Sequence, residues 1–131
     1  MPRNNEREIG WKFPVKSDLS TGTINGSSYE EDIAESIKII LMTKKGERMM
    51  RPDFGCNIYK YMFDILDITT MRQIELEIEE SIRKWEYRID DLHVHVEKSS
   101  KDSGVLKIEI IYSTFMNSDM VRQEYIYDTK N

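Results

Sequence analysis

Residues 71–97, MRQIELEIEESIRKWEYRIDDLHVHVE, contain the change of hydrophobic period that decides the fold. Up to Trp85, apolar side chains recur at every third or fourth position, which places them on one face of a helix. After Arg88 the period becomes twofold, because Val94 and Val96 alternate with polar side chains. A long amphipathic helix followed by a half-buried strand is therefore predicted.

The twofold alternation returns in two stretches nearer the C-terminus. They are residues 105–112, VLKIEIIY, and residues 121–127, VRQEYIY, and polar turns separate them from the first strand and from each other. Consecutive strands joined by short turns pair antiparallel. The sequence therefore predicts a C-terminal three-stranded meander.

A second helix is predicted upstream of the long one. Ser28 and Glu31 have the spacing of a capping box, in which the two side chains satisfy amides at the start of a helix. Apolar residues at helical spacing follow, and Gly46 supplies a stop signal, so this helix is expected over residues 29–45. Residues 57–66 predict a further short helix, although their aromatic content also permits irregular packing.

Together these elements predict an α+β fold, with two amphipathic helices packed on one face of a small antiparallel sheet. Residues 1–10 are predicted to form a flexible N-terminal arm. Residues 11–16 predict a short extended segment that covers the domain, although Pro14 limits its strand character. No linker or repeat divides the rest, so residues 11–131 are predicted to be a single domain.

Composition argues against several classes of function. The chain has 131 residues, 39% of them hydrophobic and 33% charged, with a net charge of -5. An acidic protein is a poor partner for phosphate backbones, so no nucleic-acid partner is expected. No apolar run reaches the roughly 18 residues of a membrane span, so no membrane partner is expected either. A single cysteine cannot form an internal disulfide, which fits synthesis in a reducing cytoplasm.

A loop with charges of both signs is predicted at residues 46–55, GERMMRPDFG, directly after the first predicted helix. Charges of both signs alternate there beside proline, phenylalanine and glycine, which favours a rigid loop with an aromatic anchor. Arginine and aromatic side chains are frequent hot spots of protein interfaces. The alternative is an internal ion-pair cluster that only shapes the loop, and the same two interpretations apply to Glu86 and Arg88. The partner-binding candidates in these segments are Glu47, Arg48, Arg51, Phe54, Glu86 and Arg88.

No catalytic, metal or cofactor site is predicted. Glu47 and Asp53 are the carboxylate pair of the loop, but a glycosidase needs one carboxyl group with a raised pKa, and the neighbouring arginines favour ionised carboxylates. His93 and His95 share a strand face but lack a third local ligand, so solvated histidines are the simpler interpretation. Cys56 has no nucleophile motif around it and is interpreted as a small buried or half-buried thiol.

Residues 46–55, together with GWKFP at 10–14 and WEYRI at 85–89, resemble a family of small baseplate subunits of contractile injection machines. That family includes the lysozyme-like wedge protein of T-even phage tails and the small baseplate component of type VI secretion. Its members commonly carry a Glu-Pro-Arg triplet ahead of the first strand. Tyr87 stands here at the proline position, so the turn lacks the fixed φ of proline.

The resemblance implies a structural baseplate wedge subunit, not an enzyme. It implies several copies around a sixfold axis, bound to the larger wedge proteins and placed where the contractile sheath begins, with inner tube or hub proteins as further partners. The chain would be made and assembled in the cytoplasm and end in the baseplate of a phage tail-like particle. The alternatives are a lysozyme-like peptidoglycan hydrolase and a soluble regulatory anti-adaptor, because the same family includes proteins with both labels.

Sheath nucleation by strand addition is a further expectation. A three-stranded meander leaves two edges whose amides and carbonyls need partners, and the resemblance implies a likeness to the sheath protein's own strand-exchanging domain. The last strand is the favoured edge, with Val121, Tyr125 and Tyr127 as one contact face. The alternative is that the N-terminal segment covers this strand within the domain.

Overall fold

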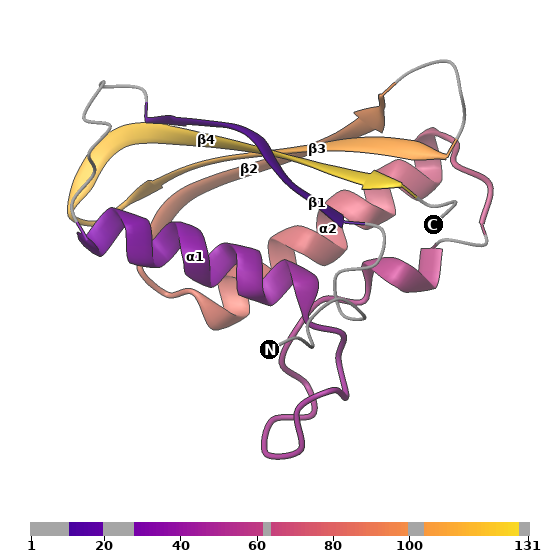
Figure 1. Cartoon of the computed structure of the whole chain (residues 1–131), viewed down its shortest axis with the longest axis horizontal. Helices are drawn as coiled ribbons and strands as arrows, with labels where there is room; N and C mark the ends of the chain where they lie inside the picture. The colour runs from indigo at the N-terminus through magenta and orange to yellow at the C-terminus, as the bar shows by residue number, and fades with distance from the viewer. Residues whose placement is uncertain (1–10, 20–27, 62–63, 100–103, 129–131) are drawn as a thin grey trace.

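The computed structural model describes residues 11–19, 28–61, 64–99 and 104–128. The arm predicted at residues 1–10 lies outside these ranges. The helices form one layer against a four-stranded sheet, and the predicted α+β class is confirmed (Figure 1). In chain order the elements are β1 (Trp11–Leu19), α1 (Ser28–Met42), the 3₁₀ turn η2 (Ile58–Tyr61), α2 (Ile68–Trp85), β2 (Ile89–Lys98), β3 (Val105–Thr114) and β4 (Asn117–Asp128).

The long amphipathic helix predicted from the sequence is α2. It begins after Asp67, whose carboxylate accepts a hydrogen bond from the Thr70 amide at 2.9 Å. A cap of this kind stabilises a helix by about 1 kcal/mol. The stripe of Ile74, Ile78 and Ile82 is buried, as its helical spacing predicts.

The first predicted helix is α1, which starts at Ser28 and ends at Met42, earlier than the expected end at residue 45. The carbonyl of Thr43 accepts a hydrogen bond from the amide of Cys56 at 2.8 Å, in place of the amide one helical turn further along. The chain therefore leaves the helix there and enters a loop. The short helix predicted after this loop is confined to η2.

The sheet has the order β1-β4-β3-β2, and all neighbouring strands are antiparallel. The strands β2, β3 and β4 form the predicted meander. β1 pairs with the outer side of β4, with Trp11 opposite Tyr127 and Leu19 opposite Val121. The register of this pair is irregular around Pro14, which has no amide to donate.

The prediction that β4 is an unpaired edge is wrong. One side of β4 pairs with β3 and the other pairs with β1. The alternative interpretation, in which the N-terminal segment covers this strand within the domain, is the arrangement observed. The outermost strands of the sheet are instead β1 and β2.

The core lies between the helices and the inner face of the sheet. Ile37 of α1, Ile78 of α2 and Ile108 of β3 are all fully buried there. At the β1 side, the ring of Trp11 packs edge-on against Tyr127, with ring centroids 4.8 Å apart. Burial of apolar surface contributes roughly 25 cal/mol per Å² and is the main force that holds the two layers together.

Candidate functional site

The loop at residues 46–55 protrudes from the helix layer, beyond the end of α1 (Figure 1). Two hydrogen bonds close its base, from the Gly46 amide to the Pro52 carbonyl at 2.6 Å and from the Cys56 amide to the Thr43 carbonyl at 2.8 Å. Gly55 has a φ of +119°, and a Cβ there would lie 2.2 Å from the Thr43 oxygen. Only glycine fits this position, because a side chain would meet backbone in a conformation that it rarely adopts.

Ion pairs fasten the loop to α2. Lys84 of α2 contacts the Asp53 carboxylate at 2.8 Å, and this hydrogen bond lowers the pKa of Asp53 below its ordinary value. Glu77 of α2 accepts a hydrogen bond from the Asn57 amide at 2.8 Å and lies 3.5 Å from Lys45. The position of the loop is therefore set by charged contacts with the helix as well as by its own glycines.

The two arginines of the loop stack on aromatic rings. The guanidinium of Arg48 lies 4.8 Å from the Phe54 ring centre, and that of Arg51 lies 5.4 Å from the Trp85 ring centre. Phe54 and Trp85 pack against each other with centroids 5.1 Å apart. Within the described ranges neither guanidinium contacts a carboxylate. Both cations are therefore held in place by rings while their hydrogen-bond donors stay exposed.

Four of the sequence candidates are thus brought together in one loop, but with different surroundings. The Glu47 carboxylate accepts a hydrogen bond from the Lys44 amide at 2.9 Å and helps to shape the loop. Phe54 is half-buried against Trp85, so it anchors the loop. Arg48 and Arg51 are exposed and present charge to the outside.

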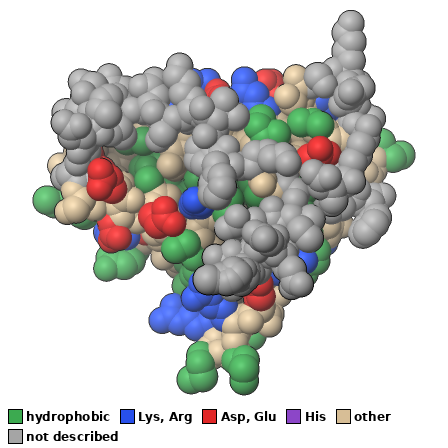
Figure 2. Space-filling model, viewed as in Figure 1, with side chains coloured by type: hydrophobic (Ala, Val, Ile, Leu, Met, Phe, Trp, Pro, Cys, Tyr) green, Lys and Arg blue, Asp and Glu red, His purple; other side chains and the backbone are tan. Residues whose placement is uncertain are grey.

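Sequence reasoning missed four contributors to this surface. Lys84 and Trp85 belong to the helical pattern of α2, and nothing in that pattern shows that they contact the loop. Met49 and Met50 at the tip are 93% and 92% exposed. The space-filling view shows Lys and Arg side chains gathered on the protruding end, with hydrophobic side chains at its tip (Figure 2). Two adjacent apolar residues within a charged loop were a visible signal for such a tip.

The second candidate segment, Glu86 and Arg88, is built differently. Glu86 is only 3% exposed and accepts hydrogen bonds from the Arg88 guanidinium at 2.8 and 2.9 Å. Arg88 also reaches Asp32 of α1 at 3.1 Å. Burial alone would raise the pKa of Glu86, but hydrogen bonds from Arg88 and Ser36 outweigh it and lower that pKa. The structure therefore gives Glu86 an internal role, which is the ion-pair alternative for this segment.

The predicted contact face on β4 lies inside the domain. Val121, Tyr125 and Tyr127 are 6%, 0% and 6% exposed. Their register places Tyr125 opposite Ile108 of β3, on the side of the sheet that the helices cover. These three side chains are core residues, and their proposed exposure to a partner was an error.

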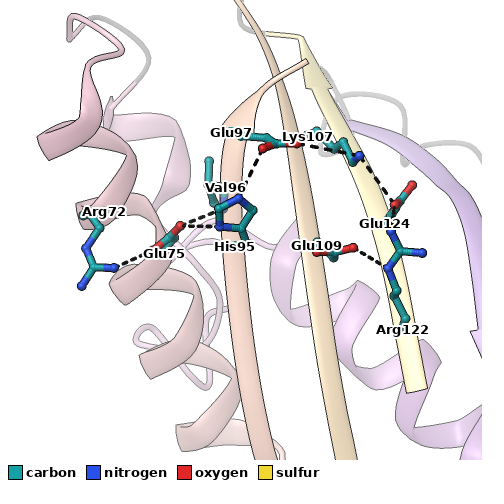
Figure 3. A network of polar contacts seen from close by, with 9 residues as sticks. All are labelled: Arg72, Glu75, His95, Val96, Glu97, Lys107, Glu109, Arg122 and Glu124. Carbon is teal, nitrogen blue, oxygen red and sulfur yellow. Dashed lines mark hydrogen bonds and ion pairs between the residues drawn. The ribbon is translucent and has the colours of Figure 1, made fainter. Parts of the chain in front are cut away.

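A network of polar contacts extends from α2 across the sheet (Figure 3). Glu75 of α2 accepts a hydrogen bond from the Val96 amide of β2 at 2.8 Å, and it lies 3.5 Å from both Arg72 and His95. Outside this network, Arg83 of α2 donates to the Asp90 carbonyl at 2.9 Å. Both contacts occupy backbone groups of the outermost strand β2. The other members of the network, on the outward face of the sheet, are Glu97, Lys107, Glu109, Arg122 and Glu124.

The structure does not favour catalysis by Cys56 or metal binding by His95. Burial raises the pKa of the Cys56 thiol to about 12, so the thiol stays protonated at neutral pH and is a poor nucleophile. His95 contacts Glu75 and Glu97. Among the residues that the structure describes, no group of three His, Cys, Asp or Glu side chains could hold a metal ion. In the same part of the chain, no helix is both long and apolar enough to cross a membrane.

Comparisons with known proteins show the family to which the chain belongs. The sequence model of the family described as "Baseplate wedge protein gp25" matches residues 27–119. The baseplate wedge protein gp25 of Enterobacteria phage T4 is 34% identical over 118 residues, which cover 90% of this chain and 82% of that protein.

Two solved structures are also similar. A Geobacter sulfurreducens protein, provisionally named a tail lysozyme, is 43% identical with a TM-score of 0.71, over 79% of this chain and 93% of its own. A chain of the type VI secretion baseplate complex has a TM-score of 0.60 over 77% of this chain and 95% of its own, and at 15% identity it shows the fold alone. The chain therefore belongs to the baseplate wedge protein gp25 family and is a structural baseplate component of a phage tail-like contractile system.

Proposed function

We propose that the chain is a non-enzymatic adaptor, which binds the larger wedge proteins through the loop at residues 46–55 and nucleates the contractile sheath through an edge of its sheet. The observation that carries the first part is the pair of arginines, Arg48 and Arg51, stacked on rings without a carboxylate partner in the described ranges. A cation that is already ordered loses little side-chain entropy when a partner carboxylate binds it.

The sheath contact is proposed at the outer side of β1. The two outermost strands differ, because Glu75 and Arg83 occupy backbone groups of β2 and α2 packs along that strand. β1 is the last strand on the other side. An extended segment of a sheath subunit would continue the antiparallel order there and satisfy its amides and carbonyls. This location replaces the edge of β4, which β1 covers.

The same proposal extends to assembly. Copies of the chain would repeat around a sixfold axis, close to inner tube or hub proteins, after synthesis and assembly in the cytoplasm. The support is membership of the baseplate wedge protein family.

A hydrolase is the second candidate, because a relative with 43% identity is provisionally named a tail lysozyme. The environment of Asp53 argues against that activity here. Its pKa is lowered by Lys84, whereas a glycosidase acid must hold its proton near neutral pH. Purified chain should therefore release no fragments from isolated cell wall. Release that Glu47→Gln abolishes would instead support the hydrolase.

The adaptor is tested by deleting the gene and examining particles by electron microscopy. We expect no sheathed particles, although free tubes and baseplate fragments can persist, and normal sheath assembly would refute the proposal.

The proposed sheath contact at the outer edge of β1 is tested by complementing the deletion with Ser17→Pro and Asp18→Pro. These adjacent β1 residues present their amides to opposite sides of the strand, so one proline removes an outward amide. If both variants fold and both seed normal sheath, the β1 edge is not used.

A further inference from the structure

The tip of the loop is a preformed turn with two apolar side chains at its centre. The Arg51 amide donates to the Arg48 carbonyl at 3.2 Å, which closes a four-residue turn with Met49 and Met50 as its middle residues. Both methionines are more than 90% exposed, at 93% and 92%. Middle positions of a turn usually carry Gly, Pro, Asn or Asp, so local turn chemistry does not explain two methionines.

The base of the turn is fixed, so the tip does not depend on a partner for its shape. The Gly46 amide bonds to the Pro52 carbonyl at 2.6 Å below the turn, and Asp53 is tied to Lys84 at 2.8 Å. The first and last residues of the turn are Arg48 and Arg51, which stack on Phe54 and Trp85. The end of the loop is therefore an apolar tip with an ordered cation on each side.

Charge indicates what kind of surface this tip fits. The chain as a whole has a net charge of -5, yet the two groups that flank the methionines are both cations. Of the neighbouring cations, Lys84 is paired with Asp53, Lys45 lies 3.5 Å from Glu77, and Lys44 lies 5.2 Å from the centre of the Tyr59 ring. A complementary surface would carry carboxylates around an apolar pocket, since thioether side chains adapt to irregular apolar pockets and arginines bind carboxylates in a bidentate manner.

We propose that Met49 and Met50 insert into an apolar pocket with an acidic rim on one of the larger wedge proteins, with Arg48 and Arg51 bound to the rim. The proposal rests on the wedge-binding role of this loop given above and names the chemistry of the surface it takes. The methionines contribute the buried centre of the contact, and the arginines determine its orientation and its sensitivity to salt.

The affinity of the full chain is measured for a wedge assembled from the larger wedge proteins of the same particle without this subunit. Met49→Ser combined with Met50→Ser should weaken binding on the order of 100-fold, because two buried side chains are replaced by polar ones. Met49→Leu combined with Met50→Leu should restore most of the affinity. Ile65→Ser combined with Ile68→Ser is the matched control, since those side chains are also exposed, at 80% and 77%, but lie outside the loop.

The outcomes separate the two levels of the proposal. If the natural chain binds the wedge and the serine variant binds within about twofold of it, the apolar tip is refuted while the adaptor role stands. If the natural chain does not bind the wedge at all, the wedge-binding role fails and the tip proposal fails with it. Equal weakening by the control pair would also overturn the tip, because the effect would then reflect general loss of apolar surface.

A photo-crosslinking diazirine residue at position 50 identifies what the tip touches. Crosslinks to an apolar segment of a larger wedge protein, beside aspartate or glutamate, are expected. Crosslinks mainly to a second copy of this chain would overturn the proposal in favour of a contact between neighbouring subunits. The same residue placed at position 65 should give crosslinks elsewhere or none.

Discussion

The loop at residues 46–55 and the turn at Glu86 and Arg88 contain the same kinds of residue, and the structure uses them in opposite ways. In the turn, Arg88 binds the carboxylate of Glu86, which is 3% exposed, so the two charges pair with each other inside the domain. In the loop, Arg48 and Arg51 lie on the faces of Phe54 and Trp85 and stay exposed. Arg88 therefore supports the fold through a buried carboxylate, whereas Arg48 and Arg51 contact rings and keep their charge exposed.

The comparison predicts that the largest loss of stability follows substitution of Arg88. In Arg88→Ala the Glu86 carboxylate is left buried without its partner, so the free energy of unfolding should fall by roughly 3 kcal/mol. Asp32→Ala is the control, because it removes only the exposed end of the same network and should lower that energy by less than about 1 kcal/mol. Urea unfolding measures both. Equal losses would show that Glu86 does not need Arg88.

The second largest loss of stability is expected from a substitution at Gly55, at the base of the loop. Gly55→Ala places a Cβ 2.2 Å from the Thr43 oxygen at a φ of +119°, so the backbone must shift. A loss of roughly 2 to 3 kcal/mol in the free energy of unfolding is expected. Gly46→Ala is the matched control, with a φ of +93° but no atom within 4 Å of the added Cβ, and it should cost about 1 kcal/mol. Thermal melting that ranks the two the other way would contradict the geometry.

Acid should weaken the turn more than it weakens the loop contacts. The folded pKa of Glu86 lies below the ordinary value of 4.5, so its pairing stabilises the fold above that pH and is lost as pH falls through the folded pKa. Unfolding free energy followed from pH 6 down to pH 3 should fall less steeply in Glu86→Gln than in the natural chain, and Asp53→Asn should keep most of the natural slope because Asp53 is exposed. An unchanged slope in Glu86→Gln would show that other carboxylates control acid unfolding.

These contrasts also show how far the sequence could lead. The change of period from α2 to β2 was readable because both patterns are local. The alternation in β4 correctly indicated that Val121, Tyr125 and Tyr127 share a face. A period of two does not say whether that face meets the core or a partner, and the helices decided it by covering that side of the sheet.

Most of the features that the sequence did not predict depend on contacts between residues far apart in the chain. The segment around Pro14 has weak strand character, and β4 supplies the ladder that makes it a strand. Lys84 and Asp53 are 31 positions apart in the sequence, so no local pattern predicts that they form an ion pair. The roles of Glu47, Arg48, Glu86 and Arg88 depended on burial, which residue types alone do not give.

The smallest expected effect on stability, and the clearest separation of fold from binding, belongs to the two exposed arginines. Arg48→Ala and Arg51→Ala each remove a ring contact at an exposed site, so the free energy of unfolding should change by only about 0.5 to 1 kcal/mol. Binding to the assembled wedge should weaken by more than about 2 kcal/mol for each, because a desolvated interface arginine contributes far more than an exposed one. Arg48→Lys keeps the charge but not the planar donor fork, and it should recover only part of the affinity. Calorimetric titration against the wedge and thermal melting of the isolated chain measure the two quantities separately. If the arginine variants lose stability in proportion to their loss of binding, the loop resembles the Glu86 turn after all, and its arginines are part of the fold.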